Sequence, residues 1–331
     1  MTLAKSQTVL FVVVFLAFAY AFVKYYWKAR LTIFPHMLTQ KTTPRHHHIP
    51  DHLRPSYEKN VARGIKETHS KKAVIVGMVR DVEKSVPTII KKVENLGLHF
   101  KDYLVVIVEN DSEDRTRELL FEWRKKNPRV TILGCGVNSP EKCVIPKTPK
   151  TIGHTADRPR IEKMANLRNI YLEYLKKSID PKEYPYTIIW DLDSLSVLYE
   201  DGFLNSMGIL AKDQDTGVMC ANGIYQWGPF SYFYDTFAYL EKGERFDLNN
   251  HTAHNLRHGA LEPIGQRGGD SKEVESCFSG FTIYRTPVLV EASYDLPKDH
   301  LVCEHVALHQ RMKGVKKVVN PSLINLILLN E

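Results

Sequence analysis

The feature that most constrains the fold is a series of short apolar runs that alternate with amphipathic stretches. Runs rich in Val and Ile occupy residues 73–79, 103–108, 130–133 and 186–190. Stretches with the apolar spacing of helices occupy residues 86–96, 115–126 and 159–177. Uninterrupted apolar strands are typical of parallel sheets that are buried on both faces. The sequence therefore predicts an α/β fold, with a mostly parallel sheet and helices on both faces.

Two acidic residues follow the last of these apolar runs. Asp191 and Asp193 are two positions apart, so on a strand end their side chains point to the same side. Carboxylate oxygens are the ligands of hard divalent cations, and the pair predicts a Mg²⁺ or Mn²⁺ site that could neutralise a diphosphate. An exposed turn with capping Asp residues is the alternative. The position directly after a buried strand favours the metal site.

The first two apolar runs also end in polar residues. Glu109 and Asp111 follow the second run, where an acidic residue binds the ribose in dinucleotide folds. The alternative for this segment is a capped helix start, in which Ser112 and Asp114 satisfy free amides, and both interpretations can hold at once. Gly77 and Arg80 end the first run, where backbone and guanidinium could approach a base or phosphates. For Arg80, a surface ion pair with Asp81 or Glu83 is the alternative.

The first 70 residues differ from the rest of the chain. Residues 8–27 hold an apolar run without charge until Lys24, with Tyr and Trp after it, which predicts a transmembrane anchor behind a short tail. A cleaved signal peptide is the alternative. Residues 28–70 contain four prolines and no sustained period, which predicts a stem or linker. The folded domain is expected to comprise residues 71–331.

Charge and cysteine content exclude two classes of protein, those that bind nucleic acid and those built on a disulfide scaffold. The formal net charge is +7, and basic residues are interspersed with acidic ones rather than gathered in one block. No zinc-finger spacing or RNP-like aromatic motif is present, so we expect no nucleic-acid partner. The five cysteines are too few and too scattered for a disulfide scaffold. Cys135 could pair with Cys143 and Cys277 with Cys303, which would leave Cys220 single.

Three further stretches carry motifs at defined spacing. They are Ala165-Asn-Leu-Arg168-Asn169 behind Arg160, Glu109-Asn-Asp-Ser-x-Asp-x-Thr116, and Ser276-Cys-Phe-Ser-Gly280. A nucleotide-binding half-sheet that ends in Asp-x-Asp is similar to type-A (GT-A) nucleotide-sugar glycosyltransferases. Together the three stretches resemble the fungal capsule-associated α-1,3-mannosyltransferase family, from about residue 73 to the end of the chain. That family has Asn-Asp-Val at 191–193, so the cation geometry is expected to differ here.

The resemblance implies a membrane-anchored glycosyltransferase that moves a hexose, in that family mannose, to a glycan acceptor. The implied donor is GDP-mannose or a UDP-hexose, with Mn²⁺ or Mg²⁺. Arg160 and Arg168 would bind the diphosphate, and His305 would complete the cation shell begun by the Asp pair. Glu304 would contact the acceptor or the donor sugar. Alternatively, Arg168 only extends along an amphipathic helix and His305 is a buried structural residue.

Two other functions and the topology stay open at this point. A sugar nucleotidyltransferase shares this sheet topology, although its Gly-rich basic loop does not follow the first apolar run. A non-catalytic glycan-binding protein would have no use for the Asp pair. Lys24, Lys28 and Arg30 outweigh Lys5, which by itself favours a cytosolic domain. Many lumenal enzymes nevertheless carry such an anchor, and we expect a single-pass protein of the Golgi or endoplasmic reticulum with a lumenal catalytic domain.

Overall fold

The computed structural model describes residues 47–134, 158–193, 196–227, 230–245 and 263–328. The chain divides into two compact units, Met1–His48 and Ile49–Glu331, and every helix and strand named below belongs to the second. The predicted anchor at 8–27 lies outside the described residues. None of the helices that the structure describes is long and apolar enough to cross a membrane.

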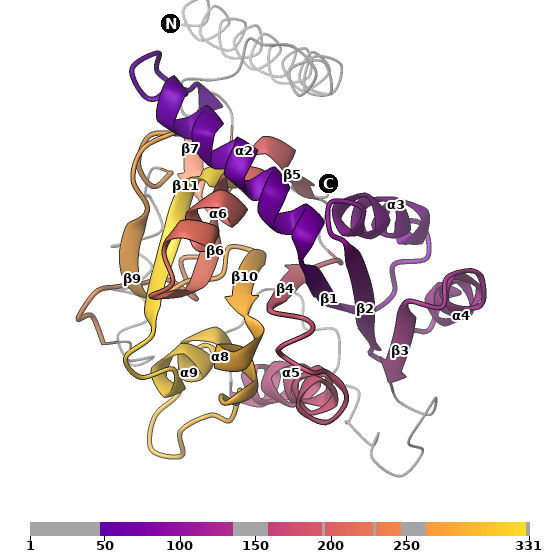
Figure 1. The fold of residues 1–331 in the computed structure, drawn as a ribbon. Helices are drawn as coiled ribbons and strands as arrows, with labels where there is room; N and C mark the ends of the chain where they lie inside the picture. Colours follow the sequence, from indigo (N-terminus) through magenta and orange to yellow (C-terminus); the bar gives the residue numbers. More distant parts are fainter. Residues whose placement is uncertain (1–46, 135–157, 194–195, 228–229, 246–262, 329–331) are drawn as a thin grey trace, which may run out of the picture. The chain divides into compact units, whose positions relative to one another are not determined.

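Within the described residues, eleven strands form one sheet (Figure 1). Their order is β3-β2-β1-β4-β10-β6-β11-β9-β8, with β5 on β11 and β7 on β6. The strands are β1 Lys72–Val79, β2 Asp102–Glu109, β3 Val130–Gly134, β4 Tyr186–Asp191, β5 Ser196–Leu198, β6 Thr216–Trp227, β7 Phe230–Phe233, β8 Leu240–Glu241, β9 Lys272–Ser276, β10 Phe281–Arg285 and β11 Lys316–Ile327. The four apolar runs of the sequence are β1 to β4.

The two halves of the sheet are built differently. In the first half, β1 pairs in parallel with β2 and β4, and β2 with β3, as predicted. In the second half, β10 runs antiparallel between β4 and β6, and β9 antiparallel on β11. The sheet is therefore mixed, and the prediction of a mostly parallel sheet is wrong for the second half. Strands β9 and β10, which residues 277–280 connect, do not pair with each other; each runs antiparallel to the neighbours that it joins, β11 for β9 and β4 and β6 for β10.

Helices cover both faces of the sheet, as the sequence predicts. They are α2 Arg54–Ser70, α3 Val86–Gly97, α4 Thr116–Lys126, α5 Arg158–Ser178, α6 Glu200–Lys212, α8 Thr286–Val290 and α9 Glu304–Arg311. Buried side chains of α5, α8 and α9 form one core with one face of the sheet. Those of α3, α4 and α6 form the second core on the opposite face (Figure 1).

Helix α2 differs from the expectation of a linker that extends to residue 70. It packs closely on α6: a Cβ on Gly64 would lie 1.8 Å from the carbonyl oxygen of Leu204, and one on Gly208 would lie 1.9 Å from that of Asn60. The contact depends on small residues instead of an apolar stripe, so hydrophobic periodicity does not indicate it. Residues 54–70 are part of the folded unit.

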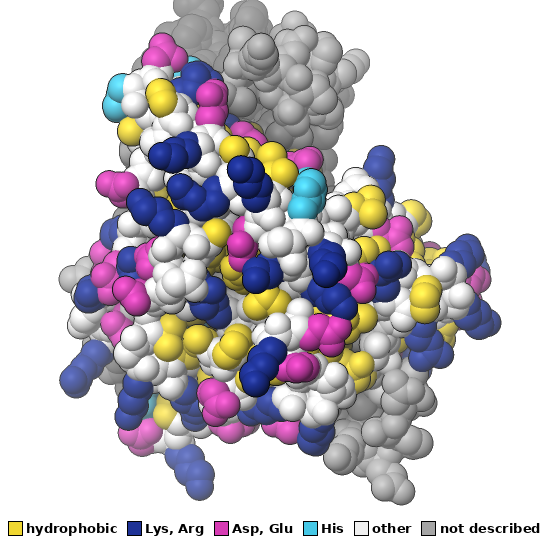
Figure 2. All heavy atoms as spheres, in the orientation of Figure 1, with side chains coloured by type: hydrophobic (Ala, Val, Ile, Leu, Met, Phe, Trp, Pro, Cys, Tyr) yellow, Lys and Arg dark blue, Asp and Glu magenta, His cyan; other side chains and the backbone are white. Residues whose placement is uncertain are grey.

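The surface of this unit carries mixed charge. Figure 2 shows Lys and Arg side chains along α2, with Asp and Glu side chains among them. Among the described residues, only Ile65 on α2 and Leu98 after α3 are exposed large hydrophobic side chains. The excess of basic residues is thus distributed among acidic ones on this face.

Candidate active site

The carboxyl ends of β1, β2 and β4 lie side by side because these strands are parallel neighbours. The register places Met78 opposite Asp191, and Val79 opposite Glu109. The polar residues that follow the three strands in the sequence therefore meet at one edge of the sheet. In open α/β sheets, ligands bind outside this edge.

The Asp-x-Asp turn is held by the residue between its carboxylates. Leu192 is buried, and it packs where a Cβ on Gly77 would lie, 2.3 Å from its Cδ1. Because Leu192 points inward, Asp191 and Asp193 point outward; the Asp191 side chain is 24% exposed and Asp193 is exposed. Gly77 thus makes room for Leu192, a packing role that differs from the expected approach to a nucleotide.

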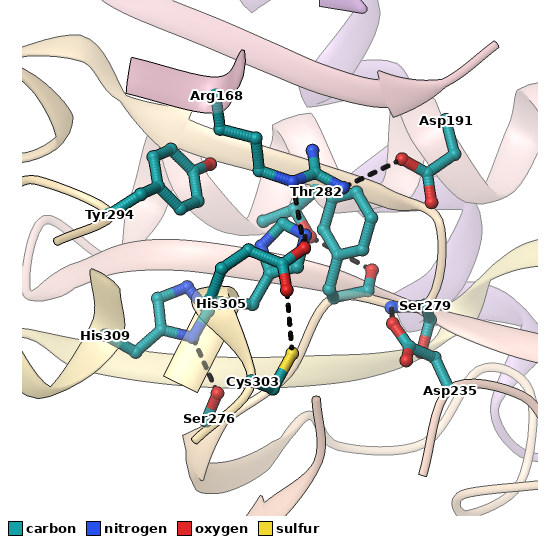
Figure 3. Close-up of polar contacts among 12 residues, drawn as sticks. Arg168, Asp191, Asp235, Ser276, Ser279, Thr282, Tyr294, Cys303, His305 and His309 are labelled. Atoms are coloured by element: carbon teal, nitrogen blue, oxygen red, sulfur yellow. Dashed lines mark hydrogen bonds and ion pairs between the residues drawn. The ribbon is translucent and has the colours of Figure 1, made fainter. Parts of the chain in front are cut away.

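Arg168 of α5 connects this turn to the start of α9 (Figure 3). Its Nη2 donates to Asp191 Oδ1 at 3.2 Å, and its Nε donates to Glu304 Oε1 at 3.1 Å. The Arg168 side chain is only 4% exposed, and its guanidinium lies 5.0 Å from the ring of Phe278. This differs from the expectation that Arg168 binds a diphosphate, since its guanidinium is enclosed by protein groups.

A fourth acidic residue at the site, Asp235, is not indicated by the sequence. It follows β7 with a left-handed φ of 74°, and its Oδ2 accepts the N–H of Ser279 at 3.2 Å. The next residue, Gly280, accepts the N–H of Asp191 at 2.9 Å through its carbonyl oxygen. The loop at 279–280 thereby joins Asp235 to the end of β4. No motif surrounds Asp235, and only the tertiary structure brings it here.

Burial and mutual repulsion shift the protonation of these carboxylates. Burial raises the pKa of Asp191 to about 7 against the opposing charge of Arg168, and the charges of Asp193 and Asp235 add to the rise. Burial, followed by the charge of Glu304, raises the pKa of Asp235 to about 6. Negative charge is therefore in excess around Arg168. A bound divalent cation would relieve this repulsion and favour the ionised carboxylates.

The two histidines of α9 have different surroundings. His309 is engaged at both ring nitrogens, at 3.0 Å from Ser276 Oγ and 3.0 Å from Tyr284 Oη, so it is structural. His305 stacks on Phe278 with ring centroids 3.6 Å apart, and neither of its ring nitrogens has a hydrogen-bond partner. Burial lowers the pKa of His305 well below its usual value, and the charge of Arg168 adds to this. The imidazole is therefore neutral.

The donor set at the strand end fits a hard cation with two protein carboxylates. No group of three or more His, Cys, Asp or Glu side chains within the described residues is placed to hold a metal ion, so His305 is not brought together with Asp191 and Asp193. Mg²⁺ and similar ions in nucleotide sites are commonly held by one or two carboxylates, with substrate phosphates and water as the other ligands. Asp191 and Asp193 are the residues that would hold the ion.

At the end of β2, an arginine binds both predicted acidic residues. Glu109 is fully buried; it accepts the N–H of Ser112 at 2.7 Å and Nε of Arg117 at 2.7 Å. Asp111 lies 3.3 Å from Arg117 Nη2, has a left-handed φ of 50°, and is 26% exposed. Glu109 therefore shapes the turn, and Asp111 is the residue of the two that a nucleotide can reach.

The remaining polar residues of this motif join the loops after β1 and β2. The bonds are Asp81 N–H to Ser112 Oγ (3.0 Å), Val82 N–H to Thr116 Oγ1 (2.8 Å) and Glu83 N–H to Asp114 Oδ2 (3.0 Å). Asp114 also accepts the N–H of Thr116 at 2.9 Å, which supports the helix-capping interpretation for this residue. The spacing of the motif thus fixes the two loops against each other beside the site.

Basic residues are found directly after β1 and on α5, and two of them, Arg80 and Lys163, are near enough for their charges to interact. Arg80 is 22% exposed, with its Nε 3.4 Å from Asp81 Oδ2. Arg160 is half-buried in the first turn of α5, and Lys163 follows one turn later. Burial, and then the charge of Arg80, lower the pKa of Lys163, while the charge of Asp111 opposes this. Lys163 is missing from the sequence prediction, although the i, i+3 spacing from Arg160 indicates a shared helix face.

The cysteine pairing differs from one of the two expected bonds. Cys220 of β6 is joined to Cys277, with Cα atoms 6.0 Å apart, so the expected bond between Cys277 and Cys303 is wrong. Cys303 is a buried thiol whose Sγ donates to Glu304 Oε2 at 3.5 Å. The other expected pair, 135 and 143, lies outside the described residues. The disulfide attaches β6 to the loop that carries Ser279.

The sequence profile of the family described as cryptococcal mannosyltransferase 1 matches residues 72–311. This match covers the parallel half-sheet, the Asp-x-Asp turn, α5 and α9. The chain belongs to this family. As a member of the cryptococcal mannosyltransferase family it is a glycosyltransferase, and the expected resemblance and enzyme class are confirmed. No curated protein matches the chain significantly.

Solved structures of other glycosyltransferases are also similar to this family member. The mannosyltransferase PcManGT from Pyrobaculum calidifontis, in complex with GDP-Man and Mn²⁺, is 13% identical with a TM-score of 0.42. That match covers 94% of this chain and 67% of the archaeal chain. TarS 1–349 from S. aureus with UDP-GlcNAc (14%, TM-score 0.43) and GalNAc-T7 with UDP, GalNAc and Mn²⁺ (12%, TM-score 0.45) are matched over 79% and 80% of this chain. This chain spans 59% and 45% of those two chains.

Proposed function

We propose that the protein transfers a hexose, with mannose as the first candidate, from a nucleoside diphosphate sugar to a hydroxyl of a glycan or glycoconjugate acceptor. GDP-mannose and UDP-hexoses are the donors to test. The observation that carries the proposal is the position of Asp191 and Asp193, which leave β4 at the edge where three parallel strands end. Membership of a mannosyltransferase family supports the choice of sugar.

The donor side of the proposed site uses the first half of the sheet. Asp191 and Asp193 would hold Mn²⁺ or Mg²⁺, which when bound stabilises the negative charge of the departing diphosphate. Arg80 and Lys163, whose charges interact, would bind phosphate oxygens, and Arg160 would do so from one turn earlier on α5. Asp111 accepts hydrogen bonds from the nucleoside, because its carboxylate is partly exposed whereas that of Glu109 is not.

The second half of the sheet supplies the groups for the sugar and the acceptor. Glu304 and Asp235 reach the site from α9 and from the segment after β7. In the transfer, the bond from the anomeric carbon to the phosphate oxygen breaks and a bond to the acceptor oxygen forms. The departing diphosphate oxygen takes the proton of the acceptor hydroxyl in this step. We assign Glu304 and Asp235 to hydrogen bonds with sugar hydroxyls, since both are acceptors when ionised.

A donor panel tests the proposed function directly. Hydrolysis and transfer would be measured with GDP-mannose, UDP-glucose, UDP-galactose and UDP-N-acetylglucosamine, in Mn²⁺ and in EDTA. We expect turnover of one donor class, present with Mn²⁺ and lost in EDTA. Asp193→Ala should remove it, and Asp215→Ala, an exposed Asp on the loop before β6, serves as the matched control. Full wild-type turnover in EDTA would contradict the cation assignment.

We also propose that residues 8–27 anchor the enzyme in a membrane of the Golgi or endoplasmic reticulum, with the catalytic domain in the lumen. The Cys220–Cys277 disulfide supports this side of the membrane, because disulfides persist in oxidising compartments and are rare in the cytosol. Protease treatment of sealed microsomes provides the test. The domain should resist digestion until detergent is added, and digestion of intact microsomes would instead support the cytosolic side that the flanking charges favour.

A further inference from the structure

Arg168 is a basic residue at the site. The proposed reaction assigns it no direct contact with the donor, the acceptor or the cation. It lies in the middle of α5 with its side chain 4% exposed, 5.0 Å from the ring of Phe278 and 5.9 Å from that of Tyr294. A guanidinium enclosed in this way does not reach a donor bound at the edge of the sheet. Its contribution therefore comes from the groups that it binds inside the protein.

One edge of the Arg168 guanidinium binds two different carboxylates (Figure 3). The Nε donates to Glu304 Oε1 at 3.1 Å, and Nη2 donates to Asp191 Oδ1 at 3.2 Å. Parallel N–H groups of this kind usually bind the two oxygens of a single carboxylate. Here they hold one carboxylate from β4 and one from α9, which would repel each other without the guanidinium between them.

The two carboxylates face different parts of the site. Asp191, with a side chain 24% exposed, belongs to the turn that would hold the cation. Glu304, 9% exposed, lies deeper and accepts a bond from Cys303 at 3.5 Å. Arg168 therefore connects the cation side of the site with the side that we assign to the sugar.

We propose that Arg168 is a positioning residue, which fixes the carboxylates of Asp191 and Glu304 at one separation so that both act on the same donor. This inference rests on the proposed function. A purely stabilising role is a weaker explanation, because buried ion pairs stabilise folds little better than apolar residues of the same volume. The planar fork of Arg spans two acceptors, which the single ammonium of Lys does not.

Arg168→Lys separates positioning from charge. We expect the Kd for Mn²⁺ to rise and kcat to fall about 10–100-fold each, which is the usual effect of altering a residue that orients a metal ligand. Binding would be followed by the electron paramagnetic resonance signal of free Mn²⁺, alongside kcat, the donor KM and thermal unfolding. The matched control is Arg267→Lys, since Arg267 is also buried and paired, with Asp201 at 2.5 Å, away from the site carboxylates. It should lower thermal stability and leave Mn²⁺ affinity and kcat unchanged.

The outcomes distinguish this inference from the proposed function. A folded Arg168→Lys variant with wild-type Mn²⁺ affinity and kcat would overturn the positioning role and leave the proposed function intact. A wild-type enzyme whose donor turnover ignores Mn²⁺ would overturn both. If Arg168→Lys does not fold, the double variant Arg168→Met, Glu304→Met removes both buried charges, which folds tolerate. Weakened Mn²⁺ binding by this variant supports the role of Arg168, and wild-type affinity overturns it.

Discussion

The ends of β2 and β4 carry the same sequence signal and do different things. Each strand ends in acidic residues, and at each end an arginine binds the last residue of the strand, Glu109 or Asp191. At β2 the arginine is local: Arg117, in the first turn of α4, follows Glu109 by 8 residues, and the other bond of Glu109 comes from the backbone of the loop between them. At β4 the partners come from afar, with Arg168 from α5 and the backbone of Gly280 before β10.

This difference distinguishes a carboxylate with a structural role from carboxylates that are candidate ligands. Glu109 is completely buried, because nearby donors satisfy it within its own loop. Asp191 and Asp193 stay partly or fully exposed, because Leu192 between them takes the inward position. An acidic strand end is thus a candidate ligand site only where the tertiary partners leave oxygen atoms facing outward.

The largest loss of activity is expected from replacing Asp193, the more exposed carboxylate at the end of β4. Asp193→Ala should reduce turnover about a thousandfold or more, because a bound cation supplies several kcal/mol of charge stabilisation in the transition state. Because Asp193 is exposed, thermal stability should stay close to wild type. Asp191→Ala should lose activity and stability together, since it removes a partner of buried Arg168. Steady-state kinetics with thermal unfolding checks both, and equal stability losses would contradict the distinction.

The parallel half of the fold could be predicted because its information is local. The strands β1 to β4 are apolar runs, and the residues that follow them mark the site edge. In this way the sequence predicts Asp191, Asp193 and Arg80 as candidate site residues, and the family resemblance implies Arg160. The sequence also indicates the acidic motif after β2, although in the structure most of its members join the loops after β1 and β2, and Asp111 rather than Glu109 is left within reach of a nucleotide.

The remaining features depend on long-range contacts that leave no local pattern. Asp235 joins the site only because Ser279 and the loop before β10 hold it there. The partner of Cys277 is Cys220 and not the nearer Cys303, since strand order decides which thiols meet. Helix α2 was missed because its packing depends on Gly64 and Gly208 instead of an apolar stripe.

The disulfide should stabilise the geometry at the end of β4 and leave that at the end of β2 unchanged. Cys277 lies in the loop whose Gly280 accepts the N–H of Asp191, while no described bond of Glu109 involves this loop. Replacing Cys220 and Cys277 by Ser should lower the free energy of unfolding by about 2–4 kcal/mol. Mn²⁺ affinity should fall as well. Denaturant unfolding and Mn²⁺ titration measure the two effects, with Cys303→Ser as the control for losing a buried sulfur without a bond.

Glu109→Gln tests the structural assignment at the β2 end. It weakens the bonds to Arg117 and to the Ser112 N–H in a fully buried position, so we expect a loss of about 1–3 kcal/mol in the free energy of unfolding. The donor KM should change little, because the side chain has no exposed surface. Asp111→Asn should behave in the opposite way, with a raised donor KM and nearly unchanged stability. A large rise in the donor KM for Glu109→Gln, without one for Asp111→Asn, would indicate that Glu109 binds the nucleotide.

The smallest expected effect is the pH dependence of Mn²⁺ affinity, which depends on the protonation of Asp191 at the end of β4. Burial raises the pKa of Asp191 to about 7, so below this pH a proton competes with the cation. Mn²⁺ affinity should rise by up to about tenfold per pH unit toward pH 7 and level off above it.

Without Mn²⁺, the same raised pKa makes the free energy of unfolding fall as pH rises, whereas Mn²⁺ affinity rises with pH. The folded protein keeps a proton on Asp191 that the unfolded chain has lost above about pH 4, so this group makes the fold less stable as pH rises from there toward about 7. His305 and His309 act in the other direction: burial lowers their pKa values, so they favour the folded state as pH rises through the usual histidine range. The measurement is therefore the difference between wild type and Asp191→Asn in EDTA, because both proteins contain the histidines. Wild type should lose stability relative to Asp191→Asn as pH rises from 5 to 7.5, values spaced around that pKa, and a constant difference would show that Asp191 titrates near its ordinary value.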